Sequence, residues 1–266
     1  MEMILQIRSL VTDWVVTGPV EGLGRFMTFC WKVLTWTVRP PFRSKLVFEQ
    51  MLFIGVNSLP IVLLTAVFTG MVFALQTGYA FRIVNAENLV GATVGISLTR
   101  EIGPVFAALM VVARAGSAMA AELGTMQVTE QVDALKTMAV SPIQYLVVPR
   151  VIAGTLAVPL LAALFSYVGV LGAYFVATQL LSINGGYFIN RLTYFVDPPD
   201  YLGGLLKAMI FGFILALISC YKGYHTKGGA AGVGKATTEA VVAASVTILV
   251  LDYFLTAWIL EFFPKF

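Results

Sequence analysis

Histidine, cysteine and charged residues are all scarce in this sequence, and each scarcity excludes a class of protein. His225 is the only histidine among 266 residues, so zinc sites, His-based catalytic triads and histidine proton relays lack the side chains they need. The two cysteines, Cys30 and Cys220, lie far apart in apolar stretches and form neither a disulfide framework nor a metal-binding pattern. Only 12% of the residues are charged, against about 25% in soluble domains. An ordinary soluble enzyme, a disordered chain and a nucleic-acid-binding domain are therefore excluded.

Apolar residues dominate what remains. They make up 59% of the chain, and the mean hydropathy is +0.88, which indicates a protein that uses lipid as its solvent. Residues 50–81 carry no charge, and we expect a kinked or tilted first span within them because Pro60 interrupts regular helix. The pattern predicts an all-α polytopic membrane protein whose permease domain covers residues 50–266. Its five transmembrane helices are expected at residues 54–81, 102–121, 151–178, 201–221 and 238–260.

The first 49 residues have a different pattern. Residues 3–16 and 22–38 place apolar and aromatic side chains at helical spacing among basic residues, which is typical of amphipathic helices at the membrane interface. A poorly formed extra span is the alternative. No cleavable signal peptide is expected, since no short apolar core with a small-residue cleavage site precedes Arg25.

Lysine and arginine are distributed unevenly among the expected loops. The N-terminal 45 residues and the loops 122–150 and 222–237 carry most of them. The other side has only Arg82, Arg191 and Lys265, with Arg100 ambiguous. The positive-inside rule then predicts a cytoplasmic N-terminus and an external C-terminus. Five spans cannot divide into two equal halves, which favours a homodimer around a shared path.

Residues 229–235 match the spacing of a phosphate-binding loop, but the context is wrong. Ala236 stands where that motif needs Ser or Thr to hold magnesium, and the segment follows a membrane span rather than a buried strand. We therefore expect a flexible cytoplasmic loop here, with no cofactor and no metal bound by this chain.

Several local motifs carry a family resemblance. The clearest are Arg100-Glu-Ile-Gly-Pro104, Ala113-Arg-Ala-Gly-Ser-Ala118, Ala121-Glu-Leu-Gly124 and Lys235-Ala-Thr-Thr238, together with Phe68-Thr-Gly-Met-Val-Phe-Ala-Leu-Gln76 and Glu130-Gln131. With these motifs the chain resembles, from about residue 45 to 260, the MlaE/YrbE permeases of Mce-type phospholipid ABC transporters.

The resemblance implies a non-enzymatic transport subunit in the bacterial inner membrane that helps maintain outer-membrane lipid asymmetry. It implies a homodimer bound to two cytoplasmic ABC ATPase subunits, which would carry the ATP and magnesium. It also implies a periplasmic Mce-domain lipid-binding protein, and it allows a small cytoplasmic accessory subunit. The rival hypothesis is an ion-coupled secondary transporter of a lipid or amphiphile, with Glu101 and Asp252 as the candidate coupling acids.

A phospholipid site is predicted where the second span would begin on the outside. Arg100 would hold the phosphate, and Glu101 would orient Arg100 or gate the site, because charges at this depth usually face a cavity or a partner. The alternative is an interfacial pair that caps the helix. Aromatic and apolar residues of the first span would form a funnel for the acyl chains, unless they simply face lipid or pack in the core. These residues are Phe73, Leu75, Tyr79 and Phe81.

A short amphipathic segment over residues 128–138 is the predicted coupling helix. The resemblance assigns it to docking on the ATPase, and the alternative is a surface helix that lies on its own bundle. The residues expected to make the contact are Glu130, Gln131, Asp133 and Leu135.

Small residues spaced by four predict a helix-packing or dimer face beside Arg114. That face consists of Gly116, Ala120 and Gly124. A similar face combines Ala208, Gly212 and Ala216. Asp252 lies in the middle of the fifth span, where three roles stay open: lining the central path, pairing with a basic group such as Arg114, or making a dimer contact.

Overall fold

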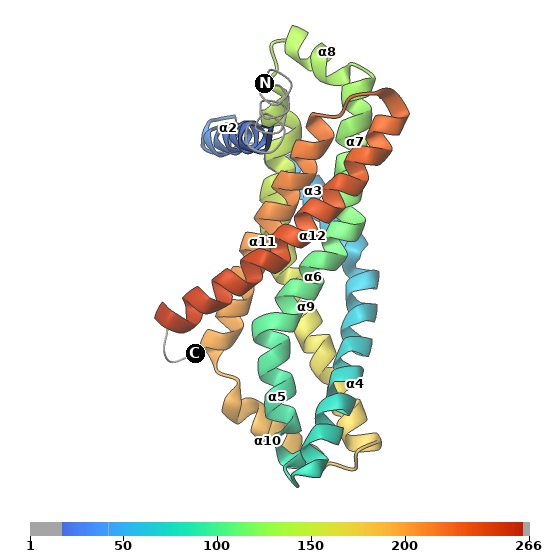
Figure 1. The fold of residues 1–266 in the computed structure, drawn as a ribbon, viewed down its shortest axis with the longest axis vertical. Coiled ribbons are helices and arrows are strands. Elements are labelled where there is room, and N and C mark those ends of the chain that lie inside the picture. Colours follow the sequence, from blue (N-terminus) through green and yellow to red (C-terminus); the bar gives the residue numbers. More distant parts are fainter. Residues whose placement is uncertain (1–17, 42, 263–266) are drawn as a thin grey trace, which may run out of the picture.

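The computed structural model describes residues 18–41 and 43–262, and all regular structure in that part is helical (Figure 1). Five helical segments there are long and apolar enough to cross a membrane, which confirms the all-α architecture with five candidate spans. They cover Ser44–Ile83, Glu87–Val128, Ile143–Gln179, Pro198–Tyr224 and Gly229–Ile259.

Each span is built from one or more helical elements. The first contains α3 (Ser44–Ile54), η2 (Val56–Ser58) and α4 (Leu59–Ile83). The second contains η3 (Glu87–Leu89), α5 (Val90–Ser97), η4 (Leu98–Ile102), α6 (Gly103–Val111), η5 (Val112–Gly116) and α7 (Ser117–Val128). The last three are formed by η6 (Ile143–Val147) with α9 (Val148–Gln179), by α11 (Pro198–Tyr224) and by α12 (Gly229–Phe262). Among the described residues, three helices lie outside the spans: α2 (Gly18–Val38), α8 (Gln131–Thr137) and α10 (Gly185–Phe195).

The second span differs most from its predicted bounds. It begins at Glu87 rather than at residue 102, so Arg100 and Glu101 lie about 20 Å inside a helical segment and not at its outer end. The prediction stopped at these charges because they interrupt the apolar run. A span tolerates charges whose partners lie inside the bundle, so hydropathy alone misplaces the boundary.

The first and fifth spans also begin earlier than expected. The domain boundary predicted at residue 49 falls within α3, which continues through η2 into α4. Residues 229–235 form the first turns of α12 instead of a flexible loop. At about 1.5 Å per residue α12 is roughly 50 Å long, more than a hydrocarbon core of about 30 Å. Figure 1 shows that α12 crosses the bundle obliquely, so a helix longer than the membrane is thick is accommodated by its tilt.

Two widened π-turns precede prolines inside the spans. Pro104 and Pro149 each remove a backbone donor and crowd the carbonyl four residues earlier, and η4 and η6 each end two positions before the proline. In η4, the Gly103 N–H bonds the Leu98 carbonyl instead of the usual acceptor. Ser166 Oγ on α9 donates to the same carbonyl at 3.0 Å. The Leu98 carbonyl in the wide turn therefore keeps hydrogen-bond partners inside the bundle. The same turn carries Arg100 and Glu101.

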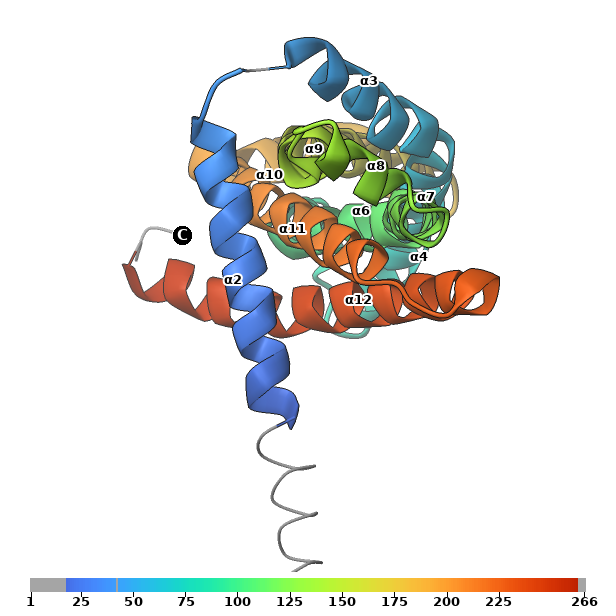
Figure 2. The same cartoon turned by 90° about the horizontal axis from the view of Figure 1, so that it is seen from above.

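α2 lies across one end of the bundle, roughly at right angles to its long axis (Figures 1 and 2). Phe26 and Phe29 pack edge-on against Tyr221 of α11, with ring centroids 5.1 and 5.4 Å apart. The opposite side of α2 exposes large apolar residues such as Met27 and Trp31, as a helix at a membrane surface does. The amphipathic stretch predicted at residues 3–16 lies outside the described residues.

α10 covers the opposite end of the bundle and was not predicted (Figure 1). Phe188 is buried against Tyr174 of α9, while Tyr187, Ile189 and Tyr194 are exposed. Asn184 begins the helix and accepts a hydrogen bond from the Gly186 N–H at 2.8 Å. The sequence carries a signal for this helix, since an Asn cap precedes a short amphipathic run.

Candidate functional site: an ionic network inside the bundle

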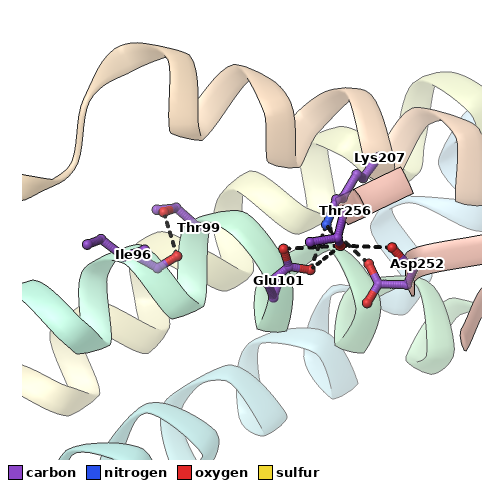
Figure 3. A network of polar contacts seen from close by, with 6 residues as sticks. All are labelled: Ile96, Thr99, Glu101, Lys207, Asp252 and Thr256. Atoms are coloured by element: carbon purple, nitrogen blue, oxygen red, sulfur yellow. Dashed lines mark hydrogen bonds and ion pairs between the residues drawn. The ribbon is translucent and has the colours of Figure 1, made fainter. Parts of the chain in front are cut away.

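Lys207 is the centre of a polar network deep in the bundle (Figure 3). Its Nζ donates to Glu101 Oε2 of η4 at 2.6 Å and to Thr256 Oγ1 of α12 at 2.6 Å. It also lies 3.3 Å from Asp252 Oδ1 of α12. Thr256 Oγ1 is 3.2 Å from Glu101 Oε2, so the four side chains form one connected cluster from three helices. Only 3% of the Lys207 side chain is exposed, which makes these partners essential for keeping its charge in the bundle.

Arg100 is held by a second carboxylate beside this cluster. Its Nε lies 2.8 Å from Asp200 Oδ1, and a terminal guanidinium nitrogen contacts the same oxygen. Asp200 is buried in the first turn of α11, where its other oxygen accepts from the Asp197 N–H at 3.1 Å. This reciprocal cap at the start of α11 fixes Asp200, and Asp200 in turn fixes the direction of Arg100.

A pocket of about 220 Å³ joins the two ion pairs. Two cations and two carboxylates line it together with apolar and small residues, whereas Asp252 contacts Lys207 without lining the pocket. Because Asp200 belongs to the first turn of α11, the pocket lies toward the end of the bundle that α10 covers. The lining residues are Ile96, Ser97, Arg100, Glu101, Asp200, Gly203, Gly204, Lys207, Thr256 and Ile259.

The structure brings together only part of the lipid site predicted from the sequence. Arg100 and Glu101 line the same pocket, but the predicted funnel residues of α4 are not among its lining residues. Phe73, Leu75 and Phe81 are half-buried and pack against the core, and Tyr79 is exposed. Their role as a lipid funnel stays a prediction.

Three members of the network were missed in the sequence: Asp200, Lys207 and Thr256. Lys207 was the detectable one, since it is the only charged residue between Asp200 and Lys222 in an otherwise apolar span. A lone charge in a span signals a cavity or a partner. Asp252 had three open roles, and the structure pairs it with a basic group, Lys207, rather than with Arg114.

Arg114 has a separate environment. It donates to the Phe53 carbonyl of α3, and its guanidinium stacks 4.7 Å from the centre of the Phe53 ring. It thus ties the second span to the first, well away from the ionic network.

The predicted small-residue face beside Arg114 lies against α11 within the same chain. A Cβ added at Gly116 would be 2.9 Å from Ser219 Oγ, and one at Gly124 would be 3.0 Å from Thr226 Oγ1. Ala120 is buried, and its carbonyl would be 2.7 Å from a Cβ added at Gly223. These close approaches show why only small residues allow η5 and α7 to touch α11 and the residues that follow it.

The predicted coupling helix is shorter than expected and has a sharp start. Glu130 adopts a left-handed backbone with φ 61°, which separates α8 from α7 and turns it away from the bundle (Figure 1). Val132 is buried and Leu135 is half-buried, whereas Gln131 and Asp133 are exposed. The hydrogen bond from Lys136 Nζ to Asp133 Oδ1, at 2.7 Å, raises the pKa of Lys136. α8 therefore presents charged side chains at the α2 end of the molecule.

These features define a multi-pass helical membrane protein that holds a charged network inside its bundle, as transport proteins do. Known proteins give the particular family. The profile of the family described as Permease MlaE matches residues 47–258. The chain therefore belongs to the MlaE family of ABC transporter permeases.

Individual relatives agree with this assignment. A probable ABC transporter permease protein of Rickettsia felis is 45% identical over 254 residues, 96% of this chain and 98% of the relative. A probable ABC transporter permease protein of Synechocystis is 44% identical over 212 residues, 80% of each chain. The intermembrane phospholipid transport system permease protein MlaE of Haemophilus influenzae is 40% identical over 241 residues, 89% of this chain and 91% of the relative. All three relatives are named as permease proteins.

Proposed function

We propose that this chain is the transmembrane subunit of an ATP-driven phospholipid transporter that acts between the bacterial inner membrane and the periplasm. Two copies would form a homodimer with an outward-facing lipid cavity at its centre. The observation that carries the proposal is the pocket in which Arg100 and Lys207 stand beside Glu101 and Asp200 inside a membrane bundle. The name of the Haemophilus relative supports phospholipid as the substrate.

The geometry suits an amphiphile with a phosphate. Arg100 offers guanidinium hydrogens to the pocket, and 27% of its side chain is exposed even though it contacts Asp200. Acyl chains would supply most of the affinity, because each buried CH₂ contributes roughly 0.8 kcal/mol. Phe73, Leu75, Tyr79 and Phe81 remain our candidates for the acyl-chain surface of the assembled dimer.

The other end of the molecule has the properties of an ATPase-docking surface. α8 projects from the α7 end of the second span, and we assign Glu130, Gln131, Asp133 and Leu135 to the contact. Glu122 of α7 lies 2.8 Å from the buried Arg150 of α9, so a push on α8 reaches two spans at once. Closure of the ATPases would thereby reshape the lipid cavity. An Mce-domain protein on the periplasmic side would exchange lipid with it.

Glu101 and Asp252 give the rival function its only specific support. Both carboxylates contact Lys207, and such a cluster is able to exchange protons. ATP-driven transport and ion-coupled transport differ in one measurable property, the energy source.

The test is lipid transfer in proteoliposomes that contain the chain with its ATPase subunits. Labelled phospholipid is followed with ATP plus ionophores, and separately with an ion gradient and no ATP. We expect transfer only in the first condition. Transfer driven by the gradient alone would establish the secondary transporter.

A photoreactive amino acid tests the cavity itself. When the protein is irradiated after detergent extraction, this side chain at Ile96, which lines the pocket, should crosslink phospholipid that the cavity retains. At Leu171, an exposed residue of α9, it should crosslink none, because the detergent has already removed the surrounding bilayer lipid. Equal capture after extraction at both positions would place the cavity elsewhere.

A further inference from the structure

A second polar cavity lies at the α2 end of the bundle, whereas the ionic network lies toward the α10 end. Its outer part has a volume of about 490 Å³, and a narrower part continues between α3 and α9. Three basic residues line it, Arg39, Arg43 and Lys136, and among the described residues no carboxylate is part of its lining. The other lining residues shared by the two parts are Trp36, Pro41 and Gln144.

Aromatic rings position the two arginines. The Arg43 guanidinium lies 4.6 Å from the centre of the Tyr145 ring, and that of Arg39 lies 5.8 Å from the centre of the Trp36 ring. Gln144 Nε2 donates to the Arg39 carbonyl at 3.3 Å, which ties the link after α2 to the start of the third span. Within the described part of the chain neither arginine forms an ion pair, so both keep hydrogen-bond donors for an anion.

An apolar groove follows this cavity along the same two helices. The narrow polar part ends at Val47 of α3 and Ile152 of α9, and the groove begins at Phe48 of α3 and at Ala157, a little more than one turn further along α9. It has a volume of about 250 Å³. From Ser44 to Leu59 the helical rise is about 22 Å, enough to accompany an acyl chain through one leaflet of about 15 Å. The groove is lined by Phe48, Met51, Leu52, Gly55, Val56, Leu59, Ala157, Leu160, Leu161 and Leu164.

We propose that this composite site binds an anionic phospholipid from the leaflet on the α2 side, which the distribution of basic residues makes the cytoplasmic leaflet. The headgroup phosphate would bind Arg39 and Arg43, with Lys136 at the rim, and one acyl chain would occupy the groove between α3 and α9. Basic pockets between spans on this side of a membrane suit anionic headgroups. The basic cavity is followed by the apolar groove, in the same order as the headgroup and the acyl chain of a phospholipid.

A soluble acidic partner would match only half of the site. It would neutralise the cations, but it would leave the apolar groove without an apolar group to fill it. The cations also lie at the end of α2, whose exposed Met27 and Trp31 mark the level of the membrane surface. A lipid accounts for both parts.

The experiment measures lipid bound to the full chain, purified with its ATPase subunits, by native mass spectrometry after addition of phosphatidylglycerol or phosphatidylcholine. Arg39→Glu with Arg43→Glu should reduce the preference for phosphatidylglycerol about tenfold. The control reverses Arg25 and Lys32, exposed cations of α2 outside the cavity, and should keep the preference. Groove filling by Leu160→Trp should reduce binding of both lipids, whereas Leu171→Trp, beyond the groove on the same helix, should not.

Two results would overturn the proposal. One is an unchanged phosphatidylglycerol preference in the Arg39→Glu/Arg43→Glu variant. The other is loss of the ATPase subunits from that variant with lipid binding intact, which would assign the cations to a protein contact. Lipid held in the outward cavity contributes equally to every variant, because none of the substituted residues lines that pocket, so differences between the variants report the composite site.

Discussion

Lys207 Nζ and Glu101 Oε2 lie 2.6 Å apart although 106 positions separate the two residues in the chain. The same ammonium group reaches Thr256 and Asp252, so all three of its hydrogens have acceptors. η4, α11 and α12 are thereby joined at one point inside the bundle. Any movement that separates these helices must break a charged contact.

The first prediction concerns the loss of that lysine. Lys207→Met leaves Glu101 and Asp252 without their cation, and uncompensated buried charges are strongly destabilising. We expect a loss of about 3 kcal/mol in stability, at the lower end for a buried pair since both carboxylates are partly exposed. Thermal unfolding in detergent measures it.

The matched control for this variant is Lys222→Met on the same helix. Lys222 pairs with Glu239 at 2.8 Å, but both side chains are substantially exposed, so less than about 1 kcal/mol should be lost. Adding Glu101→Gln to Lys207→Met should recover part of the stability by removing one stranded charge. Equal stability of Lys207→Met and the wild-type chain would show that the network does not hold the helices together.

The second prediction concerns Arg100 and Glu101 as neighbours in one pocket. Arg100→Ala should lower transport while some lipid remains bound, because the acyl chains supply most of the affinity. Glu101→Ala should act on the same step, so the double variant should lose less than the sum of the single losses. Transfer rates in proteoliposomes give the comparison. Arg82→Ala, an exposed residue paired with Glu87, is the control. Full additivity would assign the two residues to separate steps.

The third prediction concerns α8. Glu130→Lys with Asp133→Lys should weaken the complex with the ATPase, since removing one desolvated interfacial charge partner costs about 2–5 kcal/mol. Co-purification of the subunits at graded salt is the measurement. Glu87→Lys, at the opposite end of the second span, should not change the yield. An intact and fully active complex that carries both α8 changes would remove α8 from the docking surface.

The fourth prediction concerns orientation. After replacement of Cys30 and Cys220, single cysteines are placed at Ala231 in the first turns of α12 and at Asn190 on α10; both positions are exposed. A third cysteine near Phe266 tests the C-terminus. A membrane-impermeant thiol reagent applied from outside should label the second and third positions only. Labelling at Ala231 would reverse the orientation, and equal labelling of Ala231 and the C-terminus would contradict five spans.

The fifth prediction concerns close helix packing. A Cβ at Gly154 of α9 would lie 2.9 Å from Ala216 Cβ and 3.0 Å from the Gly212 carbonyl of α11, so Gly154→Ala must push the two helices apart. Overpacking of this kind costs about 1–3 kcal/mol. Gly22→Ala on α2 meets no atom within 4 Å and should stabilise its helix by up to about 1 kcal/mol. The two variants should therefore shift the melting temperature in opposite directions.

The sequence by itself determined that this is a membrane protein, how many candidate spans it has and to which family it belongs. Long apolar runs can satisfy their backbone groups in lipid only as helices, so hydropathy is nearly sufficient for the fold class. The family motifs are local and remain visible without any contacts. The amphipathic character of α2 and α8 was also readable, because helical periodicity sorts side chains by face within a few turns.

Only the tertiary structure decided where the charges act. Glu101, Lys207 and Asp252 come from three helices, and nothing in their spacing along the chain predicts that they meet. Hydropathy placed Arg100 at a helix end because it evaluates each charge alone, whereas Asp200 supplies the partner that lets the helix continue past it. The same reason applies to the basic cavity at the α2 end, because its Arg43 and Lys136 are distant along the chain and become neighbours only through helix packing.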